Sequence, residues 1–323
     1  MQYVPYLHLS SHFSLRTYGH ATLVLFLAVA NANIPSRQCI LTLGMKRILT
    51  AAALIPLVLA LVFLGPFWLI VLATAAVAAL AGWEYIGLVE KCGAQPSRIA
   101  TLVAILGLFA SRFFGDGLEW LHQTEVAFCV LALGLLVFCT FRSPVDRMLP
   151  DTSSSIFCLF YVGFTLSTIP LLREQSNGPS LLAFLLCVVW MGDITALYVG
   201  RAWGRHKMAP SLSPNKTWEG AIGSLAGSLV AAGGLWSLAA WLETMGSARL
   251  SYPDEVWYWM VLAVVVNAAA QVGDLAESAL KRSAGVKDSG TLVPGHGGVL
   301  DRIDALLLAA PVLWYAQIIH QRF

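Results

Sequence analysis

Long apolar segments are the feature that most limits how this chain can fold. After residue 44, about nine such segments follow one another, each close to the roughly 20 residues that a helix needs to cross a bilayer. The segments are 47–64, 67–89, 98–114, 125–141, 154–172, 179–200, 218–242, 256–280 and 300–318. None alternates apolar and polar residues as the strands of a membrane barrel do. The sequence therefore predicts an all-α, polytopic integral membrane protein with about nine transmembrane helices.

The composition supports this fold class and argues against a nucleic-acid-binding protein. Of the 323 residues, 58% are hydrophobic and only 12% are charged, whereas soluble domains carry about 25% charged residues. The net charge of +2 is too small to indicate a nucleic-acid partner. The six cysteines form no C-x-x-C pair and have no histidine at zinc-ligand spacing, which argues against a zinc site.

The first 44 residues differ from the rest of the chain. Their apolar run, 21–30, is too short to cross a bilayer, and its flanks fit a signal peptide poorly. From Met45 the sequence MKRILTAAALIP has positive charge followed by an apolar helix, which is typical of the start of a membrane protein. We expect residues 1–44 to be an N-terminal extension or an over-long start assignment, and residues 45–323 to form one transmembrane domain.

Lysine and arginine residues are unevenly distributed over the loops. Most of them lie before the first apolar segment or after the second, fourth, sixth and eighth. Positively charged loops remain in the cytoplasm. The sequence therefore predicts that the loops 201–217 and 281–301 face the cytoplasm, in a multi-pass protein of the inner (cytoplasmic) cell membrane.

Acidic residues lie at the end of the apolar segment 256–280. On a helix, Asp274, Glu277 and Lys281 fall at i, i+3 and i+7 and share one face. An acid within a membrane span costs about 2.5–3.5 kcal/mol on insertion scales. Two neighbouring carboxylates also repel each other unless a cation lies between them. We interpret Asp274 as a metal ligand; the alternative is a structural Glu277–Lys281 ion pair.

The loop that follows, KRSAGVKDSGTLVPGHGGVLDRID from 281 to 304, is rich in glycine and charge. Its turn at 294–298 can form a nest of backbone N–H groups for an anion. Asp301 and Asp304 stand at i and i+3 at the start of the last apolar segment, which favours a shared metal or catalytic role. The alternative, that Asp301 only caps a helix, would leave Asp304 unexplained.

A third polar region runs from 191 to 220. Asp193 lies inside an apolar segment, and the following loop carries basic residues between Trp and Pro. This pattern is typical of a site for a phosphorylated ligand with a ring, although an ordinary positively charged cytoplasmic loop is the alternative. Glu84, Asn267 and Gln271 also lie in apolar segments, and we interpret them as inter-helix hydrogen-bonding groups rather than ligands. The chain contains no P-loop and no G-x-G-x-x-G motif.

The stretch 278–304 resembles the signature of the phosphatidate cytidylyltransferase (CDP-diacylglycerol synthase) family. That signature runs S-x-hydrophobic-K-R, then K-D, then H-G-G-hydrophobic-x-D-R-hydrophobic-D. The matching positions are Ser278, Lys281, Arg282, Lys287, Asp288, His296, Gly297, Gly298, Asp301, Arg302 and Asp304. The segment from Asp193 through LSPNKTWEG (212–220) is similar too, although Asn215 stands where the family more often has Gly. The resemblance covers roughly residues 45–320.

The resemblance implies an enzyme that makes CDP-diacylglycerol and pyrophosphate from CTP and phosphatidate, in phospholipid biosynthesis. It also implies Mg²⁺ dependence, K⁺ beside the Mg²⁺, and a homodimer in the lipid bilayer. The expected metal ligands are Asp274, Asp301 and Asp304. The expected catalytic residues are Lys281, Arg282, Lys287, Asp288, His296 and Arg302. The expected substrate-binding residues are Asp193, Arg205, Lys207, Ser213, Lys216, Gly297 and Gly298.

Two other functions remain open at this point. A CTP- or ATP-dependent lipid kinase of the polyprenol or phytol type would also be polytopic, with polar cytoplasmic loops. It would transfer the γ-phosphate and release a nucleoside diphosphate, whereas a cytidylyltransferase releases pyrophosphate. A cation-coupled transporter would carry its acidic residues near mid-membrane rather than clustered beside basic loops.

Overall fold

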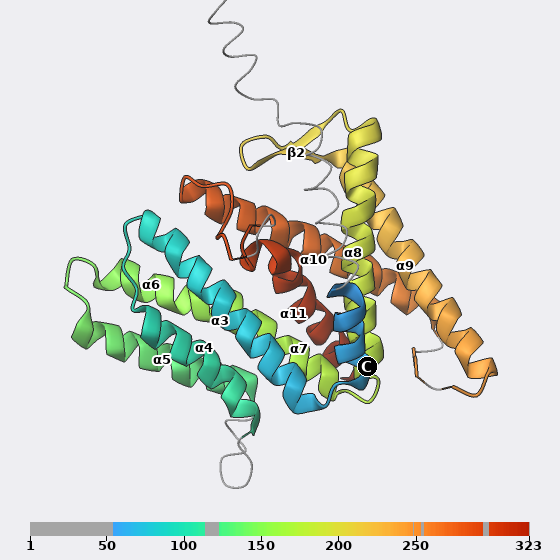
Figure 1. Ribbon diagram of the computed structural model, residues 1–323, viewed down its shortest axis with the longest axis horizontal. Coiled ribbons are helices and arrows are strands. Elements are labelled where there is room, and N and C mark those ends of the chain that lie inside the picture. Colours follow the sequence, from blue (N-terminus) through green and yellow to red (C-terminus); the bar gives the residue numbers. More distant parts are fainter. Residues whose placement is uncertain (1–53, 114–122, 248, 253–254, 293–296, 323) are drawn as a thin grey trace, which may run out of the picture. The chain divides into compact units, whose positions relative to one another are not determined.

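The computed structural model describes residues 54–113, 123–247, 249–252, 255–292 and 297–322. The predicted extension 1–44 lies outside these residues. The described chain is almost entirely helical, which confirms the predicted all-α class (Figure 1). After an apolar helix at Leu54–Leu64, the elements are α3 (Phe67–Lys91), α4 (Arg98–Ala110), α5 (Thr124–Arg142), α6 (Met148–Cys158), α7 (Thr165–Glu174), α8 (Gly178–Trp203), β1 (Lys207–Ala209), β2 (Ser213–Thr217), α9 (Trp218–Thr244), α10 (Val256–Ser283) and α11 (Leu300–Arg322).

Seven helices of the described chain are long and apolar enough to cross a membrane. They are α3, α5, α8, α9, α10, α11 and a continuous helix from Met148 to Glu174, in which a π-helical turn at Leu159–Phe164 joins α6 to α7. Two of the predicted segments are not among these seven. The first begins outside the described residues, and its described part is a helix from Leu54 to Leu64. The third, α4, has 13 residues and extends for only about 20 Å.

Helix boundaries follow local signals in the sequence. Pro66, which cannot continue the preceding helix, stands before the first residue of α3. Thr217 is the N-cap of α9, and its hydroxyl accepts a hydrogen bond from the Gly220 N–H at 3.1 Å. Ser97 caps α4 in the same way through the Ala100 N–H.

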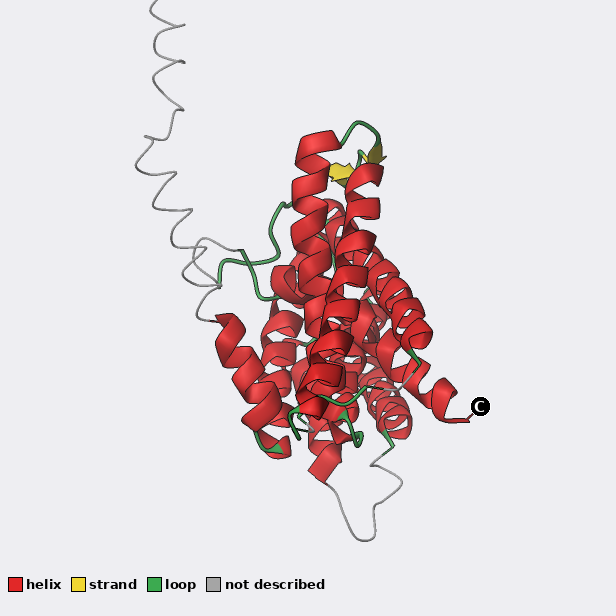
Figure 2. Ribbon diagram, turned by 90° about the vertical axis from the view of Figure 1, so that its right-hand side faces the viewer, coloured by secondary structure: helices red, strands yellow, loops and turns green. Residues whose placement is uncertain are grey.

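The hairpin of β1 and β2 interrupts the helices between α8 and α9. Its strands are antiparallel, with Lys207 opposite Thr217 and Ala209 opposite Ser213. Figure 2 shows the hairpin at one end of the long helices, beside the helix ends. The sequence predicted only a polar loop here, because the strands are short and poor in the β-branched and aromatic residues that mark strands.

Helix α11 joins the two parts of the apolar core. One core cluster is built mainly on α3, α4 and the Met148–Glu174 helix, and it includes Leu300 and Leu307 of α11. The other is built mainly on α8 and α10, and it includes Ala309 and Leu313 of α11. Figure 1 shows α11 among these helices, beside α10. Helix α11 therefore packs against both parts, with Leu300 and Leu307 in one cluster and Ala309 and Leu313 in the other.

Small residues let α8, α9, α10 and α11 approach closely. A Cβ at Gly273 of α10 would lie 2.6 Å from the Asp304 carbonyl oxygen of α11. A Cβ at Gly192 of α8 would lie 2.7 Å from Asn267 Nδ2. Asn267 Nδ2 donates to Ser224 Oγ and to Ser228 Oγ, both at 2.8 Å. The interpretation of Asn267 as an inter-helix hydrogen-bonding group is confirmed, and these close contacts are typical of helices packed in a membrane.

Candidate active site

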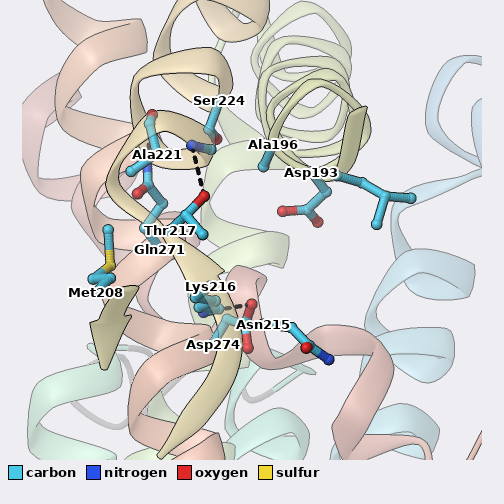
Figure 3. A pocket seen from close by; sticks show the side chains of 12 residues that line it. Asp193, Ala196, Met208, Asn215, Lys216, Thr217, Ala221, Ser224, Gln271 and Asp274 are labelled. Atoms are coloured by element: carbon cyan, nitrogen blue, oxygen red, sulfur yellow. Dashed lines mark hydrogen bonds and ion pairs between the residues drawn. The ribbon is translucent and has the colours of Figure 1, made fainter. Parts of the chain in front are cut away.

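A pocket of about 260 Å³ lies between α8, α9, α10 and the hairpin (Figure 3). Its lining includes Asp193 of α8, Lys216 of β2 and Asp274 of α10. These three residues come from separate motifs in the sequence, and the fold brings them to one opening. Figure 3 shows the carboxylates of Asp193 and Asp274 directed toward this opening.

The charged side chains at this pocket are mostly acidic. Lys216 Nζ lies 2.6 Å from Asp274 Oδ2. Asp193 interacts electrostatically with both Asp274 and Lys216. Asp304 of α11 interacts electrostatically with Asp274 and Asp193. We call Asp193, Lys216, Asp274 and Asp304 the pocket cluster. The cluster thus contains three carboxylates and one lysine, and Asp304 also interacts electrostatically with Lys281.

The hairpin explains why Lys216 reaches α10. Thr217 is the last residue of β2 and the N-cap of α9, so the strand that carries Lys216 is fixed at the N-terminus of that helix. On the other side of the hairpin, Arg282 Nε donates to the Leu212 carbonyl oxygen at 3.1 Å. The hairpin is therefore held from both α9 and α10, with Lys216 between these two points of attachment.

A second group of charges lies nearer the loop between α10 and α11, about one turn after Asp274 on α10 and one turn before Asp304 on α11. Lys281 Nζ forms an ion pair with Glu277, and it lies 2.6 Å from Asp301 Oδ1. The Glu277 side chain is fully buried, at 0% exposure. Asp301 Oδ2 also accepts hydrogen bonds from the Ser289 N–H at 3.0 Å and the Gly298 N–H at 2.7 Å. We call Glu277, Lys281, Asp301 and Ser289 the loop cluster.

The predicted metal ligands divide between the two clusters. Asp274 and Asp304 belong to the pocket cluster with Asp193, whereas Asp301 belongs to the loop cluster. Asp301 and Asp304 share a face of α11, as their spacing predicted, but they lie a turn apart, and Lys281 occupies the position beside Asp301. The Glu277–Lys281 ion pair that was the alternative interpretation is present.

The described residues contain no group of three or more His, Cys, Asp or Glu side chains arranged to hold a metal ion. The Lys216 ammonium lies where a cation would contact Asp274. The donor type of the pocket cluster nevertheless fits Mg²⁺, because carboxylate oxygens are its preferred protein ligands and the cluster contains three carboxylates. Asp193, which the sequence suggested as a substrate-binding residue, is the third carboxylate.

The glycine turn makes contacts that the sequence did not predict. Gly297 has φ +80, a conformation that favours glycine. The N–H groups of residues 298–300 donate to carboxylates of the chain itself, and of these three residues Gly298 belongs to the turn 294–298 that was expected to face an anion. Gly298 donates to Asp301, while Val299 and Leu300 donate to Glu84 of α3. The Gly298 amide of the predicted anion nest at 294–298 is therefore occupied by Asp301, whereas residues 294–296 of the nest lie outside the described residues. His296 lies outside the described residues.

The remaining predicted residues lie on the exposed rim. Lys287, Asp288 and Arg302 are exposed in or beside the loop between α10 and α11. Arg205 and Lys207 are exposed at the start of the hairpin, and Ser213 begins β2. None of these six residues lines the pocket as Lys216 does. They are near the site in the fold without contributing to its walls.

Tyr161 is a neighbour of the site that the sequence did not reveal. It belongs to the π-helical turn, and its buried hydroxyl has no hydrogen-bond partner among the described residues. It interacts electrostatically with Glu277, Asp304 and Asp274. π-Helical turns are frequent at functional sites, but a Tyr in an aromatic-rich apolar segment gives no such signal in the sequence.

Comparison with known proteins gives one consistent family. The model of the Cytidylyltransferase family matches residues 45–319. A "Phosphatidate cytidylyltransferase" of Haemophilus influenzae is 34% identical over 292 residues, covering 84% of this chain and 97% of that protein. One of Synechocystis is 32% identical over 301 residues, covering 84% and 95%.

A third relative, a "Phosphatidate cytidylyltransferase" of Brucella abortus, is 48% identical over 157 residues. This match covers 48% of the chain and 54% of the relative, so it spans about half of that protein's length. The family match extends over most of the chain and includes both clusters. The chain therefore belongs to the Cytidylyltransferase family.

Proposed function

We propose that this membrane protein is a phosphatidate cytidylyltransferase, which forms CDP-diacylglycerol and pyrophosphate from CTP and phosphatidate. The observation that carries the proposal is the pocket cluster, where Asp193, Asp274 and Lys216 line one opening beside Asp304. Within a Cytidylyltransferase family chain, such a group suits a reaction between two phosphates. Two relatives whose length is matched almost completely are named phosphatidate cytidylyltransferase.

The chemistry requires little help from a base. The lipid phosphate is already an anion near neutral pH, and one of its oxygens attacks the α-phosphorus of CTP. A new P–O bond forms to the α-phosphorus, the bond between the α- and β-phosphates breaks, and pyrophosphate leaves with the electron pair. The main barrier is the repulsion between two anions. Catalysis therefore depends on positioning the phosphates and neutralising their charge.

The pocket cluster has side chains for both tasks. Lys216 would contact a phosphate, and its ion pair with Asp274 would open as it does so. Asp193, Asp274 and Asp304 would hold Mg²⁺, which neutralises phosphate charge when bound. K⁺, which the resemblance implies beside the Mg²⁺, stays a proposal. Asp301 would act through the loop cluster rather than as a ligand of the same ion.

The basic residues around the pocket would complete the phosphate site. Arg282, Lys287 and Arg302 are exposed at the end of α10, in the following loop and at the start of α11, and they would contact the phosphates of the nucleotide. Lys281, with its side chain 13% exposed between two carboxylates, would organise the loop. We place the loops on the cytoplasmic side of the inner membrane, since Lys and Arg gather there. The acyl chains of phosphatidate would remain in the bilayer, and a homodimer is part of the same proposal.

The proposal is tested with the purified full-length chain in detergent micelles containing phosphatidate. CTP labelled in its α-phosphate is added with Mg²⁺ or with EDTA. We expect label in the lipid product and release of pyrophosphate, one for one, only with Mg²⁺. Release of CDP together with transfer of the γ-phosphate of CTP to a lipid would indicate the kinase instead. Absence of any nucleotide turnover in a folded preparation would contradict both.

A further inference from the structure

Glu84 is a buried carboxylate of α3 that lies against the loop between α10 and α11. It is 4% exposed and stands more than 200 positions before the residues that it contacts. Glu84 Oε1 accepts from the Val299 N–H at 3.0 Å. Glu84 Oε2 accepts from the Leu300 N–H at 2.8 Å and from Ser289 Oγ at 3.1 Å.

These contacts fix the start of α11. The N–H groups of the first turn of a helix have no partner within the helix, and a negative charge near them is stabilising. Here the negative charge comes from another helix, α3. Because the carboxylate binds two successive N–H groups, it sets both the position and the direction of the first turn. That turn carries Asp301, and Asp304 follows it.

The loop is shaped to admit this carboxylate. A Cβ at Gly290 would lie 2.4 Å from Glu84 Oε1, and a Cβ at Gly298 would lie 2.3 Å from Glu84 Oε2. Real Cβ atoms do not approach oxygen atoms so closely, so a side chain at either position would displace Glu84 or the loop. Glycine at positions 290 and 298 is therefore explained by the close approach of Glu84, joined at Gly298 by Ser289 Oγ, which would lie 2.2 Å from a Cβ.

Ser289 connects Glu84 to the charged residues of the site. Its hydroxyl lies 3.1 Å from Glu84 Oε2 and 2.9 Å from Asp301 Oδ2. A hydroxyl has one proton, so it donates to one of these carboxylates at a time. Asp301 is in turn paired with Lys281. A continuous set of contacts thus runs from α3 through the loop to α10 and α11.

We propose that Glu84 is a positioning residue: it holds the glycine loop and the first turn of α11 so that Asp301 and Asp304 meet the charges of α10. This proposal rests on the proposed cytidylyltransferase function. Glu84 does not line the pocket, so it would act through Ser289 and the backbone of residues 298–300. Its burial makes a charge costly unless hydrogen bonds compensate, and the three contacts supply that compensation.

The test uses the full-length chain with Glu84→Gln, Ser289→Ala and the double variant. Glutamine keeps the size of the side chain but points an NH₂ group at a backbone N–H. We expect Glu84→Gln to lower kcat about tenfold or more while KM for CTP changes little, since small displacements of reacting groups have large effects. Because both substitutions break the same set of contacts, their combined effect should be smaller than the product of the two.

The control is Glu90→Gln on the same helix. Glu90 is ion-paired with Arg98 at the surface, and its replacement should leave kcat unchanged. Hydrogen exchange of residues 297–303 gives a readout that does not depend on activity, and it should rise in Glu84→Gln and not in Glu90→Gln. A folded Glu84→Gln protein with native kcat and native exchange would overturn the proposal.

Failure of this proposal can be told apart from failure of the proposed function. If the native chain has no cytidylyltransferase activity, the exchange measurement still tests whether Glu84 fixes the loop. If Glu84→Gln does not fold, Ser289→Ala decides. A folded Ser289→Ala protein with lowered kcat and faster exchange at residues 297–303 supports the proposal. One with native values of both contradicts it.

Discussion

The pocket cluster and the loop cluster contain similar residues in different environments. In the pocket cluster, the Lys216 and Asp274 side chains are 25% and 35% exposed, and they face an open pocket. In the loop cluster, the Lys281, Glu277 and Asp301 side chains are 13%, 0% and 7% exposed. Both clusters have more acid than base, but in the loop cluster Lys281 lies between Glu277 and Asp301, and backbone N–H groups also donate to Asp301, whereas the carboxylates of the pocket cluster lie at or beside an open pocket. The comparison separates side chains that bind a ligand from those that shape the site.

The largest expected effect is on activity and comes from the pocket cluster. Asp274→Asn removes a carboxylate that faces the opening, and we expect turnover of CTP and phosphatidate to fall by about 10²–10³-fold, as when a group that stabilises transition-state charge is lost. The unfolding midpoint in detergent should stay close to native, because Asp274 is partly exposed. The exposed Asp146 gives the control Asp146→Asn, which should have native activity. Native turnover in Asp274→Asn would contradict the assignment of ligand binding to the pocket cluster.

The next effect is on stability and comes from the loop cluster. Lys281→Met leaves Glu277 and Asp301 without their cation, and removing one partner of a buried ion pair costs about 3–5 kcal/mol. Unfolding in detergent should therefore occur at clearly lower denaturant concentration. Adding Glu277→Gln to this variant should recover part of the loss, because it removes one unpaired buried charge. If the double variant is no more stable than Lys281→Met, the unpaired charge of Glu277 is not the cause of the lost stability.

A smaller effect is expected if Lys216 and Mg²⁺ compete for Asp274 in the pocket. Lys216→Met removes the ammonium that is paired with Asp274. We expect kcat to fall about tenfold, because a phosphate contact is lost, while half-maximal activity is reached at lower Mg²⁺ concentration. A Mg²⁺ titration of activity measures both quantities. An unchanged or higher Mg²⁺ requirement would show that Lys216 and the metal do not share Asp274.

The smallest effect belongs to a surface ion pair outside both clusters. Glu90 and Arg98 lie 2.5 Å apart, with side chains 34% and 30% exposed. Exposed pairs contribute about 0–1 kcal/mol, so Glu90→Gln should shift the unfolding free energy by less than about 1 kcal/mol. A loss as large as that of Lys281→Met would mean that burial is not what separates strong from weak pairs in this fold.

The apolar segments predicted most of the fold, because membrane helices can be recognised in a sequence by their length and hydropathy. The segment 98–114 was the weakest of them, since its helix ends at Ala110 and a short 3₁₀ turn follows. The hairpin was missed, and with it the path by which Lys216 reaches Asp274. Strands this short carry too little pattern to be recognised.

The sequence predicted individual residues of the candidate site but not how they are arranged in space. Asp193, Lys216 and Asp274 were each chosen from the sequence, yet nothing in their separate motifs shows that they line one pocket. Their meeting depends on close helix contacts at Gly192 and Gly273, which are set by tertiary packing. The spacing of Asp301 and Asp304 predicted one helix face correctly. It could not show that Lys281 would occupy the place beside Asp301.

The most direct test of this account is the binding of Mn²⁺, as a paramagnetic substitute for Mg²⁺, measured by electron paramagnetic resonance on the full-length chain. We expect the native protein to bind Mn²⁺, Asp274→Asn to lose this binding, and a folded Asp301→Asn protein to keep it. Binding that survives in Asp274→Asn, or that is lost equally in Asp301→Asn, would contradict the assignment of the cation to the pocket cluster.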